Sequence, residues 1–425
     1  MSSRAGVVLL LLVASLAAAL ISGKELFFNL AYAWGGFLLL SFVWSRTSLA
    51  GVSLEREARS ARTQVGYVLE ERISLVNRSR FPKVWVEFDD HSDLLGHRAS
   101  NVSMGLRGRH ERVWAVRTLC LQRGSFRLGP GTLRAGDPFG LFPVTREVPE
   151  TEQVVVMPMT ARLSRFALPP GHRPGGEALR HRTHQVTPSA AGVRDYAPGD
   201  ALNRIHWPST ARRLRLIVKE FELDPKADIW ILLDAARQAQ AGSSSIPDAE
   251  IPHWTSQRVV RLPDSTEEYA VAAAASIAVH LGEEDRAVGL ISYGSKRLAV
   301  QPDRGRKQLA RILESLAILK ADGSLTLEGV LKIELRQIPR GASVVLITPE
   351  TSSGLLSVAR QMDRRGLLPI LVLVDAQSFG GDEGTAGLAG AAERAGFVVR
   401  VIRRGDDLGE ALSRLQVRRA FARAA

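Results

Sequence analysis

The sequence has almost no cysteine. Its 425 residues include a single one, Cys120, so no disulfide can form within the chain. This favours a reducing compartment, although extracytoplasmic bacterial proteins often lack cysteines as well. Aromatic residues are also few, but hydrophobic residues make up 45% of the chain and charged residues 24%. This proportion excludes a disordered chain and indicates globular domains.

Acidic residues are outnumbered by basic ones. The chain has 56 Lys and Arg against 44 Asp and Glu, a net charge of +12. Such a balance suits nucleic acid or an anionic membrane surface as a partner. The arginines are spread along the chain, and the arginine-rich stretch lacks the interleaved aromatic residues of a single-strand binder. A lipid bilayer is therefore an expected partner, and nucleic acid is not.

Two segments near the N-terminus carry no charged residue. Residues 7–22 and 26–44 are apolar throughout, and only Gly-Lys-Glu separates them. A membrane-spanning helix needs about 20 apolar residues. The pattern predicts a transmembrane hairpin over residues 1–48, with spans at about 5–22 and 26–44. Two alternatives remain: a signal peptide cleaved near Ala17–Ala19, and a hairpin buried in a soluble core.

Flanking charges predict the orientation of this hairpin. Arg4 precedes the first span, while Lys24 and Glu25 in the turn cancel. Four arginines follow the second span: Arg46, Arg56, Arg59 and Arg62. Loops rich in Lys and Arg stay on the cytoplasmic side of a membrane. The chain is therefore predicted to cross the inner, or cytoplasmic, cell membrane twice, with its soluble domains in the cytoplasm.

Short β-prone runs separated by turn residues fill residues 50–160, and none has a helical period. The pattern predicts an all-β, immunoglobulin-like sandwich. Trp85 and Trp114 are its predicted core residues. One polar group is interpreted as a solvated turn rather than a metal site: Asp89, Asp90, His91 and Asp93.

Residues 161–226 form a linking segment of unusual composition. Its first part, 171–184, is rich in Gly, Pro, Arg and His and is expected to be a loop. His181 and His184 have an HxxH spacing, but a zinc site needs three or four ligands. No spacing in the sequence brings a third ligand to this pair, so the segment is interpreted as a basic loop.

A dense group of charged residues follows, within the sequence GVRDYAPGDALNRIHWPSTARRLRLIVKEFE at 192–222. The Pro-Gly-Asp tripeptide predicts a tight turn. The candidate binding or interdomain residues are Arg194, Asp195, Tyr196, Gly199, Asp200, Arg204, His206, Trp207 and Arg212. They could build a hydrogen-bonded clasp between two domains, or line an anion site or an active site. No catalytic residue is assigned, because no nucleophile, base and orienting residue share a recognisable spacing.

This segment closely resembles the core motif of the bacterial and archaeal family called domain of unknown function 58. The runs RDYAPGD, NRIHW, STARR and LIVKEFE match the family's R-E-Y-x-P-G-D, R-x-I-H-W, T-A-R and short hydrophobic strand with acidic residues. The earlier run GSFRLGPGTLRAGDPFGLF at 124–142, preceded by Arg123, is similar to its R-G-x-Y-x-L-G-P and D-P-F-G-L-F, with Phe126 in place of tyrosine. The resemblance implies a membrane anchor, a von Willebrand factor A-like C-terminal domain and frequent association with MoxR-type AAA+ ATPases.

Strand and helix patterns alternate over residues 227–425. Continuous apolar runs at 227–235, 342–350 and 367–376 are typical of strands buried on both faces. The alternation predicts a Rossmann-type α/β domain with a mostly parallel sheet, which agrees with the von Willebrand A-like fold that the resemblance implies. Ser265 and Glu268 have the spacing of a helical capping box.

In such sheets, ligands bind at the carboxyl ends of the strands. The von Willebrand A fold places a magnesium site there with the pattern D-x-S-x-S, whose oxygens suit that hard cation. This chain has Asp234, Ala236 and Gln238 instead, so two hydroxyl ligands are missing. We therefore expect a degenerate site without metal or cofactor, in which Asp234 caps the segment that follows it.

Together these features predict a membrane-anchored, non-catalytic interaction or adaptor protein. Its expected partners are a MoxR-type AAA+ ATPase, suggested by the resemblance, and other membrane or envelope proteins, in envelope stress or complex assembly. The alternative is an enzyme or anion-binding protein that uses the charged motif at 194–206.

Overall fold

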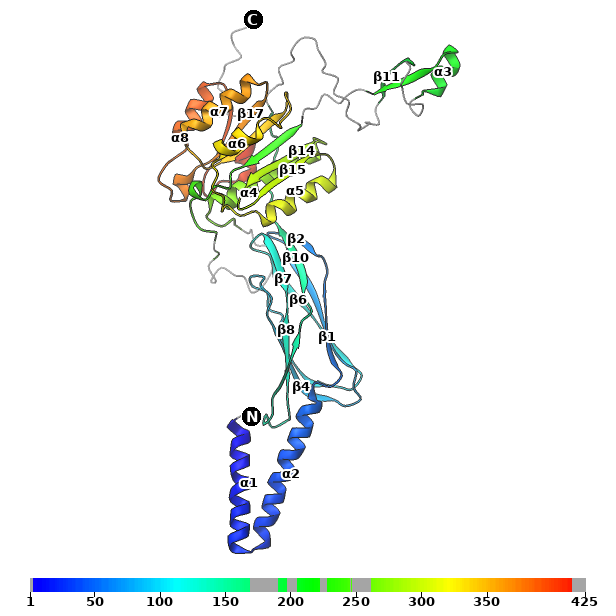
Figure 1. Ribbon diagram of the computed structural model, residues 1–425, viewed down its shortest axis with the longest axis vertical. Helices are drawn as coiled ribbons and strands as arrows, with labels where there is room; N and C mark the ends of the chain where they lie inside the picture. The colour runs from blue at the N-terminus through cyan, green and yellow to red at the C-terminus, as the bar shows by residue number, and fades with distance from the viewer. Residues whose placement is uncertain are drawn as a thin grey trace.

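The computed structural model describes residues 3–168, 190–196, 205–221, 228–244, 246 and 261–414. A helical hairpin lies at one end of the molecule, a β domain follows it, and an α/β domain lies beyond the β domain (Figure 1). This arrangement agrees with the predicted order of two apolar N-terminal helices, a β-rich region and a C-terminal α/β region.

The hairpin consists of α1 (Ser3–Ser22) and α2 (Glu25–Ser48). Both helices are long and apolar enough to cross a membrane. In the most apolar stretch of each helix, only 11% of the residues are buried inside the protein. A helix that buried its apolar residues in a soluble core would expose far fewer of them. Length and composition therefore agree with the two predicted spans.

The β domain packs three small sheets together. Its strands are β1 (Val52–Ala58), β2 (Arg62–Gln64), β3 (Val68–Asn77), β4 (Lys83–Asp90), β5 (Asn101–Leu106), β6 (Glu111–Leu119), β7 (Gly124–Leu128), β8 (Gly131–Ala135), β9 (Val144–Val148) and β10 (Glu152–Met157). The strand orders are β1-β3-β6, β5-β4-β8-β9 and β2-β10-β7. Neighbouring strands are antiparallel except β2 and β10. The all-β prediction for this region is confirmed.

Alternation along the strands builds the β-domain core. In β3 every second side chain is buried, including Leu69, Ile73 and Leu75, because successive side chains of a strand point to opposite faces. Trp114 packs against the core with its ring 6.3 Å from that of Phe88. Trp85, the other predicted core tryptophan, is only half-buried.

The α/β domain has a six-stranded sheet with the order β15-β14-β13-β16-β17-β18. Its strands are β13 (Ile229–Leu233), β14 (Val288–Tyr293), β15 (Arg297–Asp303), β16 (Ser343–Thr348), β17 (Leu368–Val374) and β18 (Val398–Ile402). The edge strand β15 is antiparallel to β14, and the other neighbours are parallel. The predicted buried runs are β13, β16 and β17, and β14 and β15 form a hairpin at one edge of the sheet.

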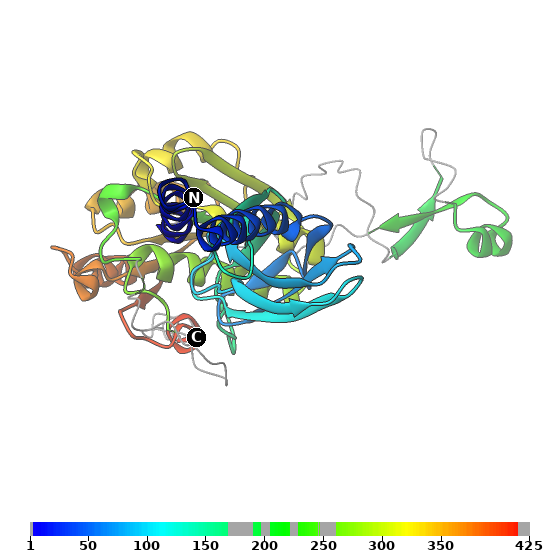
Figure 2. The ribbon, with the colours of Figure 1, turned by 90° about the horizontal axis from the view of Figure 1, so that it is seen from below.

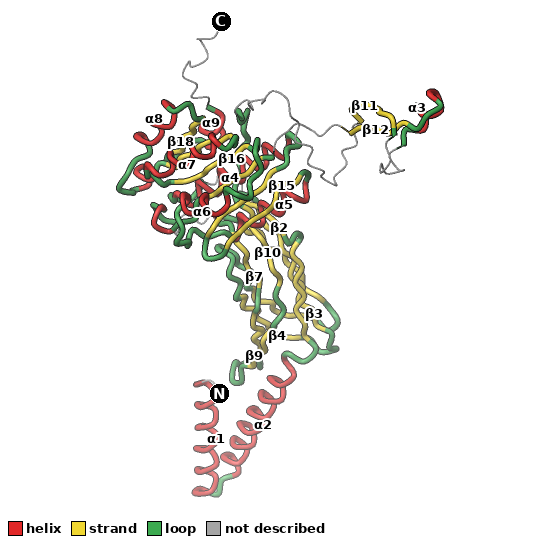
Figure 3. The backbone as a smooth tube through the Cα atoms, turned by 45° about the horizontal axis from the view of Figure 1, so that its top comes forward, coloured by secondary structure: helices red, strands yellow, loops and turns green. Residues whose placement is uncertain are grey.

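Helices cover both faces of this sheet (Figure 3). They are α4 (Thr266–Glu283), α5 (Arg306–Ile318), α6 (Leu327–Glu334), α7 (Ser353–Arg364), α8 (Ala386–Arg394) and α9 (Leu408–Ser413), with short 3-10 turns η2 (Arg237–Ala239) and η4 (Ala376–Phe379). One core lies between the sheet and α4, α5 and α9, and the other lies between the sheet and α6, α7 and α8. Alternate residues of β13 face each core, which explains its unbroken apolar sequence.

The charged motif forms a small separate unit. Strands β11 (Ala190–Asp195) and β12 (Ile217–Phe221) pair as an antiparallel hairpin, and α3 (Trp207–Arg213) lies in the connection between them. In both Figure 1 and the view from below in Figure 2, this unit lies to one side of the two larger domains.

Candidate functional site

The carboxyl edge of the α/β sheet carries a buried aspartate. Asp234 follows β13 and is 4% exposed, and Thr348 ends the neighbouring strand β16. The Thr348 hydroxyl donates to Asp234 Oδ2 at 2.6 Å, and the Ala236 amide donates to Asp234 Oδ1 at 2.9 Å. Both carboxylate oxygens are thus used inside the protein, as expected of a residue that caps the end of its strand.

Burial raises the pKa of Asp234 to about 6, because the charged form loses water. Hydrogen bonds from Thr348 and Ala236 lower it, and the nearby charge of Glu350 raises it further. Glu350 accepts a hydrogen bond from Ser352 at 2.6 Å through Oε1, while its Oε2 is buried without a hydrogen-bond partner. A cation at this edge would contact the side-chain oxygens of Asp234, Thr348 and Glu350.

The remaining positions of the magnesium pattern contribute little to such a site. Ala236 is buried and has no oxygen on its side chain, and Gln238 is exposed in η2. Across the described part of the chain, no group of three or more His, Cys, Asp or Glu side chains could hold a metal ion. The expectation of a degenerate site without metal at Asp234, Ala236 and Gln238 stays a prediction.

A second site joins the β domain to the α/β domain, and its centre is Arg123. This residue lies just before β7 and its side chain is 5% exposed. Its Nη2 lies 2.6 Å from Glu267 Oε1 and 3.1 Å from Glu268 Oε1. Its Nε donates to Glu268 Oε2 at 3.3 Å, and its Nη1 donates to the carbonyls of Leu316 and Leu319 at 3.3 and 3.2 Å.

These contacts place one guanidinium between two helix ends. The glutamates lie in the first turn of α4, where the helix dipole favours negative charge. The two carbonyls belong to the last turn of α5 and the residue after it, where the dipole favours a cation. A planar group with five N–H donors can satisfy both ends at once, which the single ammonium of lysine cannot.

The sequence placed Glu268 in a capping box, and the structure corrects this. Ser265 is the N-cap residue of α4, but no side-chain hydrogen bond caps the helix there. Glu268 instead pairs with Arg123. Burial raises the pKa of the Glu268 carboxyl, and this effect outweighs the Arg123 charge, which lowers it. Local spacing predicted a contact within the helix, whereas a residue from another domain provides the stronger, charged partner.

An exposed pair and a backbone contact extend the same joint. Arg62 Nε lies 2.7 Å from Glu314 Oε1, with the two side chains 61% and 32% exposed. Gln122 donates to the carbonyl of Ser244 at 3.2 Å. Arg123 is therefore the buried centre of an interface that has a solvated rim.

The predicted motif residues fall into three groups. Asp195 and Tyr196 lie at the end of β11, His206 precedes α3, and Trp207 and Arg212 lie within α3. Arg194 is part of β11, but only its backbone is described. Three residues lie outside the described residues: Gly199, Asp200 and Arg204. The clasp that Asp200 and Arg204 would form thus stays a prediction.

The described contacts of this unit are made within it. Asp195 Oδ2 lies 2.9 Å from Arg215 Nη1, with both side chains more than half exposed. His206 Nδ1 and Ser209 Oγ are 2.7 Å apart, and the Ser209 amide donates to the His206 carbonyl, which is the geometry of a helix start. Trp207 beside them is 65% exposed. His206 and Ser209 themselves are half-buried.

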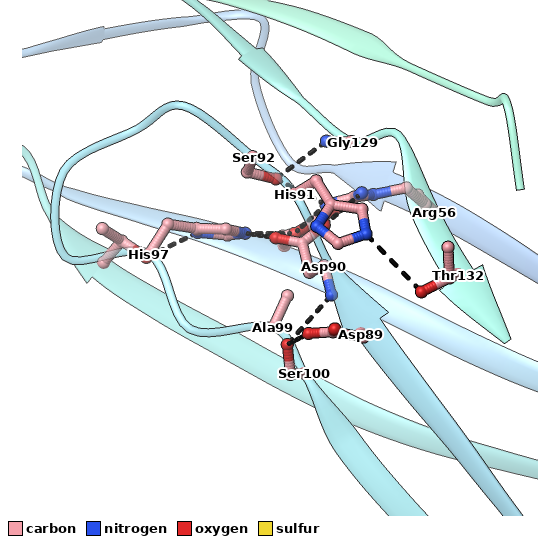
Figure 4. A network of polar contacts seen from close by, with 12 residues as sticks. Arg56, Asp89, Asp90, His91, Ser92, His97, Ala99, Ser100, Gly129 and Thr132 are labelled. Carbon is pink, nitrogen blue, oxygen red and sulfur yellow. Dashed lines mark hydrogen bonds and ion pairs between the residues drawn. The ribbon is translucent and has the colours of Figure 1, made fainter. Parts of the chain in front are cut away.

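A buried ionic network that the sequence did not reveal lies inside the β domain (Figure 4). Arg56 Nε is 2.7 Å from Glu71 Oε1, and its Nη1 is 2.7 Å from Asp90 Oδ1. His97 Nε2 lies 3.0 Å from Glu71 Oε2, and His97 Nδ1 lies 2.8 Å from Thr118 Oγ1. Burial raises the pKa of the Glu71 carboxyl, but hydrogen bonds from His97 and Arg56 outweigh it, so the net pKa lies below the usual value.

The network overturns the interpretation of Asp90 as part of a solvated turn, because its side chain is only 3% exposed. The neighbouring residues have structural partners as well. Asp93 accepts from the amide of Arg127, and His91 Nε2 lies 3.5 Å from Thr132 Oγ1. The cluster therefore ties β1, β3 and β4 to the loops beside them.

The comparisons with known proteins agree with the motifs. The family model described as "Protein of unknown function DUF58" matches residues 192–378. The resemblance to the DUF58 family is confirmed. The DUF58 match includes the motif unit and the α/β domain from β13 to the start of η4, so it contains Glu267 and Glu268 but not Arg123.

One curated relative shares more of the chain. The protein described as "Uncharacterized protein YeaD" of Bacillus subtilis (strain 168) is 23% identical over 350 residues, which are 80% of this chain and 81% of that protein. The solved structures are more distant. The CARDB domain of the PF1109 protein from Pyrococcus furiosus has 12% identity and a TM-score of 0.20, covering 25% of this chain and 91% of that one. Proximal thread matrix protein 1 from the mussel byssus has 11% identity and a TM-score of 0.30, covering 44% and 46%. At such scores neither structure carries information on the function of this chain.

Proposed function

We propose that this chain is a membrane-anchored interaction protein, in which α1 and α2 hold the two soluble domains at the cytoplasmic face of the cell membrane. Support comes from the length and apolar surface of the two helices. The arginines that flank the hairpin support the orientation.

The finer identities of the two domains belong to the same proposal. Packed antiparallel sheets with alternating burial support an immunoglobulin-like β domain. A parallel sheet covered by helices on both faces, with an antiparallel edge strand and Asp234 at the carboxyl end of β13, supports a von Willebrand A-like head.

The observation that carries the proposal is the joint at Arg123. In this proposal the α/β domain binds the partner and is held in a fixed position relative to the anchor. A buried arginine that bonds two helix ends of the α/β domain provides such a fixed attachment. The loops after β16 and β17 lie at the carboxyl edge of the sheet, where Ser352 and Glu383 are exposed and could contact a partner.

The partner class in this proposal is a MoxR-type AAA+ ATPase, as the family resemblance suggests. The test is affinity capture of the full chain from cross-linked native membranes, followed by mass spectrometry. We expect a MoxR-type ATPase among the captured proteins, and less of it with Glu383→Lys at the carboxyl edge. Asp363→Lys, an equal charge change in α7, is the matched control and should capture as much as the wild type. Absence of the ATPase from the wild-type sample would reject this partner.

A further inference from the structure

The end of the β domain next to the anchor presents a second surface. The chain leaves α2 at Ser48 and enters β1 at Val52, so the two are only a few residues apart. The loops β3–β4 (78–82), β5–β6 (107–110) and β8–β9 (136–143) lie at this same end, because β3, β5 and β8 all run toward it. We call these three loops the membrane-proximal face.

Two of these loops are strongly basic. Loops 78–82 and 107–110 contain four arginines and no acidic residue. Arg78 lies 3.1 Å from Glu55, but in the described residues no carboxylate pairs with the exposed Arg80, Arg107 or Arg109. Unpaired arginines on one face create a positive potential that attracts anions, and the strength of this attraction falls with salt.

The loops are held in place rather than merely exposed. The side-chain amide of Asn77, which is fully buried, donates to the carbonyls of Phe81 and Arg107 at 2.9 and 3.1 Å. The Arg109 amide donates to the Ser79 carbonyl at 2.9 Å. A Cβ atom at Gly108 would overlap the carbonyl oxygen of Arg80, so only glycine lets the two loops approach this closely.

The membrane-proximal face also carries exposed phenylalanines. Phe81 is 75% exposed between the basic loops, and Phe139 in the third loop is 54% exposed. The Phe139 ring packs edge-on against Phe37 of α2, with centroids 4.7 Å apart. Phe37 precedes Trp44 by seven residues, which places this contact about 10 Å along the helix from Trp44. If α2 spans the bilayer, Phe139 in the third loop lies in the headgroup region of the bilayer or deeper in the acyl chains.

Hydrogen bonds also hold the base of the third loop in place. Asp137 is fully buried and accepts hydrogen bonds from the amides of Phe139 and Phe142 at 3.0 and 2.7 Å. Ser45 of α2 donates to the carbonyl of Phe142 at 2.6 Å. The basic loops therefore lie on the same rigid domain as an aromatic loop that is fixed to the anchor.

We propose that the membrane-proximal face binds the headgroups of anionic phospholipids in the bilayer that holds α1 and α2. This inference rests on the proposed membrane anchoring. The arginines supply phosphate-binding donors, and the phenylalanines supply apolar contact at the boundary between headgroups and acyl chains. Each basic residue near an anionic membrane surface contributes about a fivefold preference.

The test uses the full chain reconstituted in vesicles of phosphatidylcholine with about one-third phosphatidylglycerol, and trace spin-labelled forms of either lipid. Electron paramagnetic resonance measures how strongly each label associates with the protein. We expect at least about a fivefold preference for phosphatidylglycerol. Arg80→Gln with Arg107→Gln should abolish most of it, whereas Arg336→Gln with Arg340→Gln, an equal loss of exposed charge in the α/β domain, should not.

Four outcomes would overturn the proposal. An equal association of both lipids with the wild type, or an undiminished preference in the Arg80/Arg107 variant, would show that this face does not select anionic lipid. A change in oligomeric mass of that variant, without a change in lipid preference, would assign the face to a second copy of the chain. Failure of the wild type to float with the vesicles would reject the anchoring itself, and is thus distinguishable from the first two.

Discussion

Replacing Arg123 by methionine is expected to loosen the α/β domain from the β domain. Methionine has a similar length but no charge and no donors. The change leaves Glu267 and Glu268 facing each other at the start of α4, and leaves the carbonyls of Leu316 and Leu319 without this donor. Two like charges in a mostly buried site repel and have lost their counter-charge.

The magnitude follows from the burial of the group. Removing one partner of a buried ion pair costs about 3–5 kcal/mol, because the remaining charge stays desolvated. For domains of this size each kcal/mol shifts the melting temperature by about 2–4 °C, so a loss of about 6–20 °C is expected. Arg123→Lys should fall between methionine and the wild type, since it keeps the charge but has too few donors to reach both helix ends.

Arg62→Met provides the matched control. It removes another arginine of the β domain that reaches the α/β domain, but its pair with Glu314 is exposed. Exposed pairs contribute about 0–1 kcal/mol, so the melting temperature should barely change. Scanning calorimetry on the full chain in detergent measures both variants. Spin labels at Met104 and Arg340 report in parallel on how narrow the distribution of interdomain distances is.

The reasoning about Arg123 fails if Arg123→Met melts within about 2 °C of the wild type and keeps an equally narrow distance distribution. It also fails if adding Glu268→Gln to Arg123→Met makes the protein less stable. In the buried-pair account, this second change removes one of the two repelling charges and should restore part of the loss.

Four further outcomes are expected. The raised pKa of Asp234 lowers the stability of the fold by on the order of 3 kcal/mol as pH rises from about 4 to 6. Asp234→Asn should therefore be more stable than the wild type above pH 6, which melting curves across pH would measure. The lowered pKa of Glu71 stabilises the fold above its unfolded pKa, and that contribution disappears as pH falls through the folded pKa, so Glu71→Gln should flatten the acid limb of a denaturation profile. Gly108→Ala should cost about 1–3 kcal/mol in denaturant unfolding, since the Arg80 carbonyl belongs to the backbone and cannot simply rotate away. Asp200→Ala should lower the melting temperature and open residues 171–190 to protease if the motif is a clasp, whereas a stable, uncleaved and non-functional variant in cells would favour an anion or active site.

Patterns that are local in sequence predicted most of the fold. The apolar runs of β13, β16 and β17 come from strands buried on both faces, and such burial needs no knowledge of the partner strands. The two apolar segments at the N-terminus are the helices α1 and α2. Period and length were sufficient in each case.

The ionic contacts could not be predicted in the same way. Arg123 and Glu267 are 144 residues apart, and Arg56 and Asp90 are 34 apart, so no spacing rule connects them. Asp90 looked solvated because its sequence neighbours are polar, yet a buried arginine from β1 neutralises it. The available signals were indirect: an arginine just before a recognisable motif, and two adjacent glutamates at a helix start.

The two β-domain motifs carry contacts at opposite ends of one stretch of chain. Arg123 contacts the α/β domain, then β7 and β8 follow, and the loop with Phe139 and Phe142 contacts α2. Twelve residues lie between Arg123 and Gly136, and in extended form this stretch covers about 40 Å. The stretch is hydrogen-bonded to β10 along β7 and to β4 and β9 along β8, so neither half can slide without breaking a ladder. A segment that contacts α2 at one end and the α/β domain at the other would explain why both motifs occur in the β domain: they fix the position of the α/β domain relative to α2.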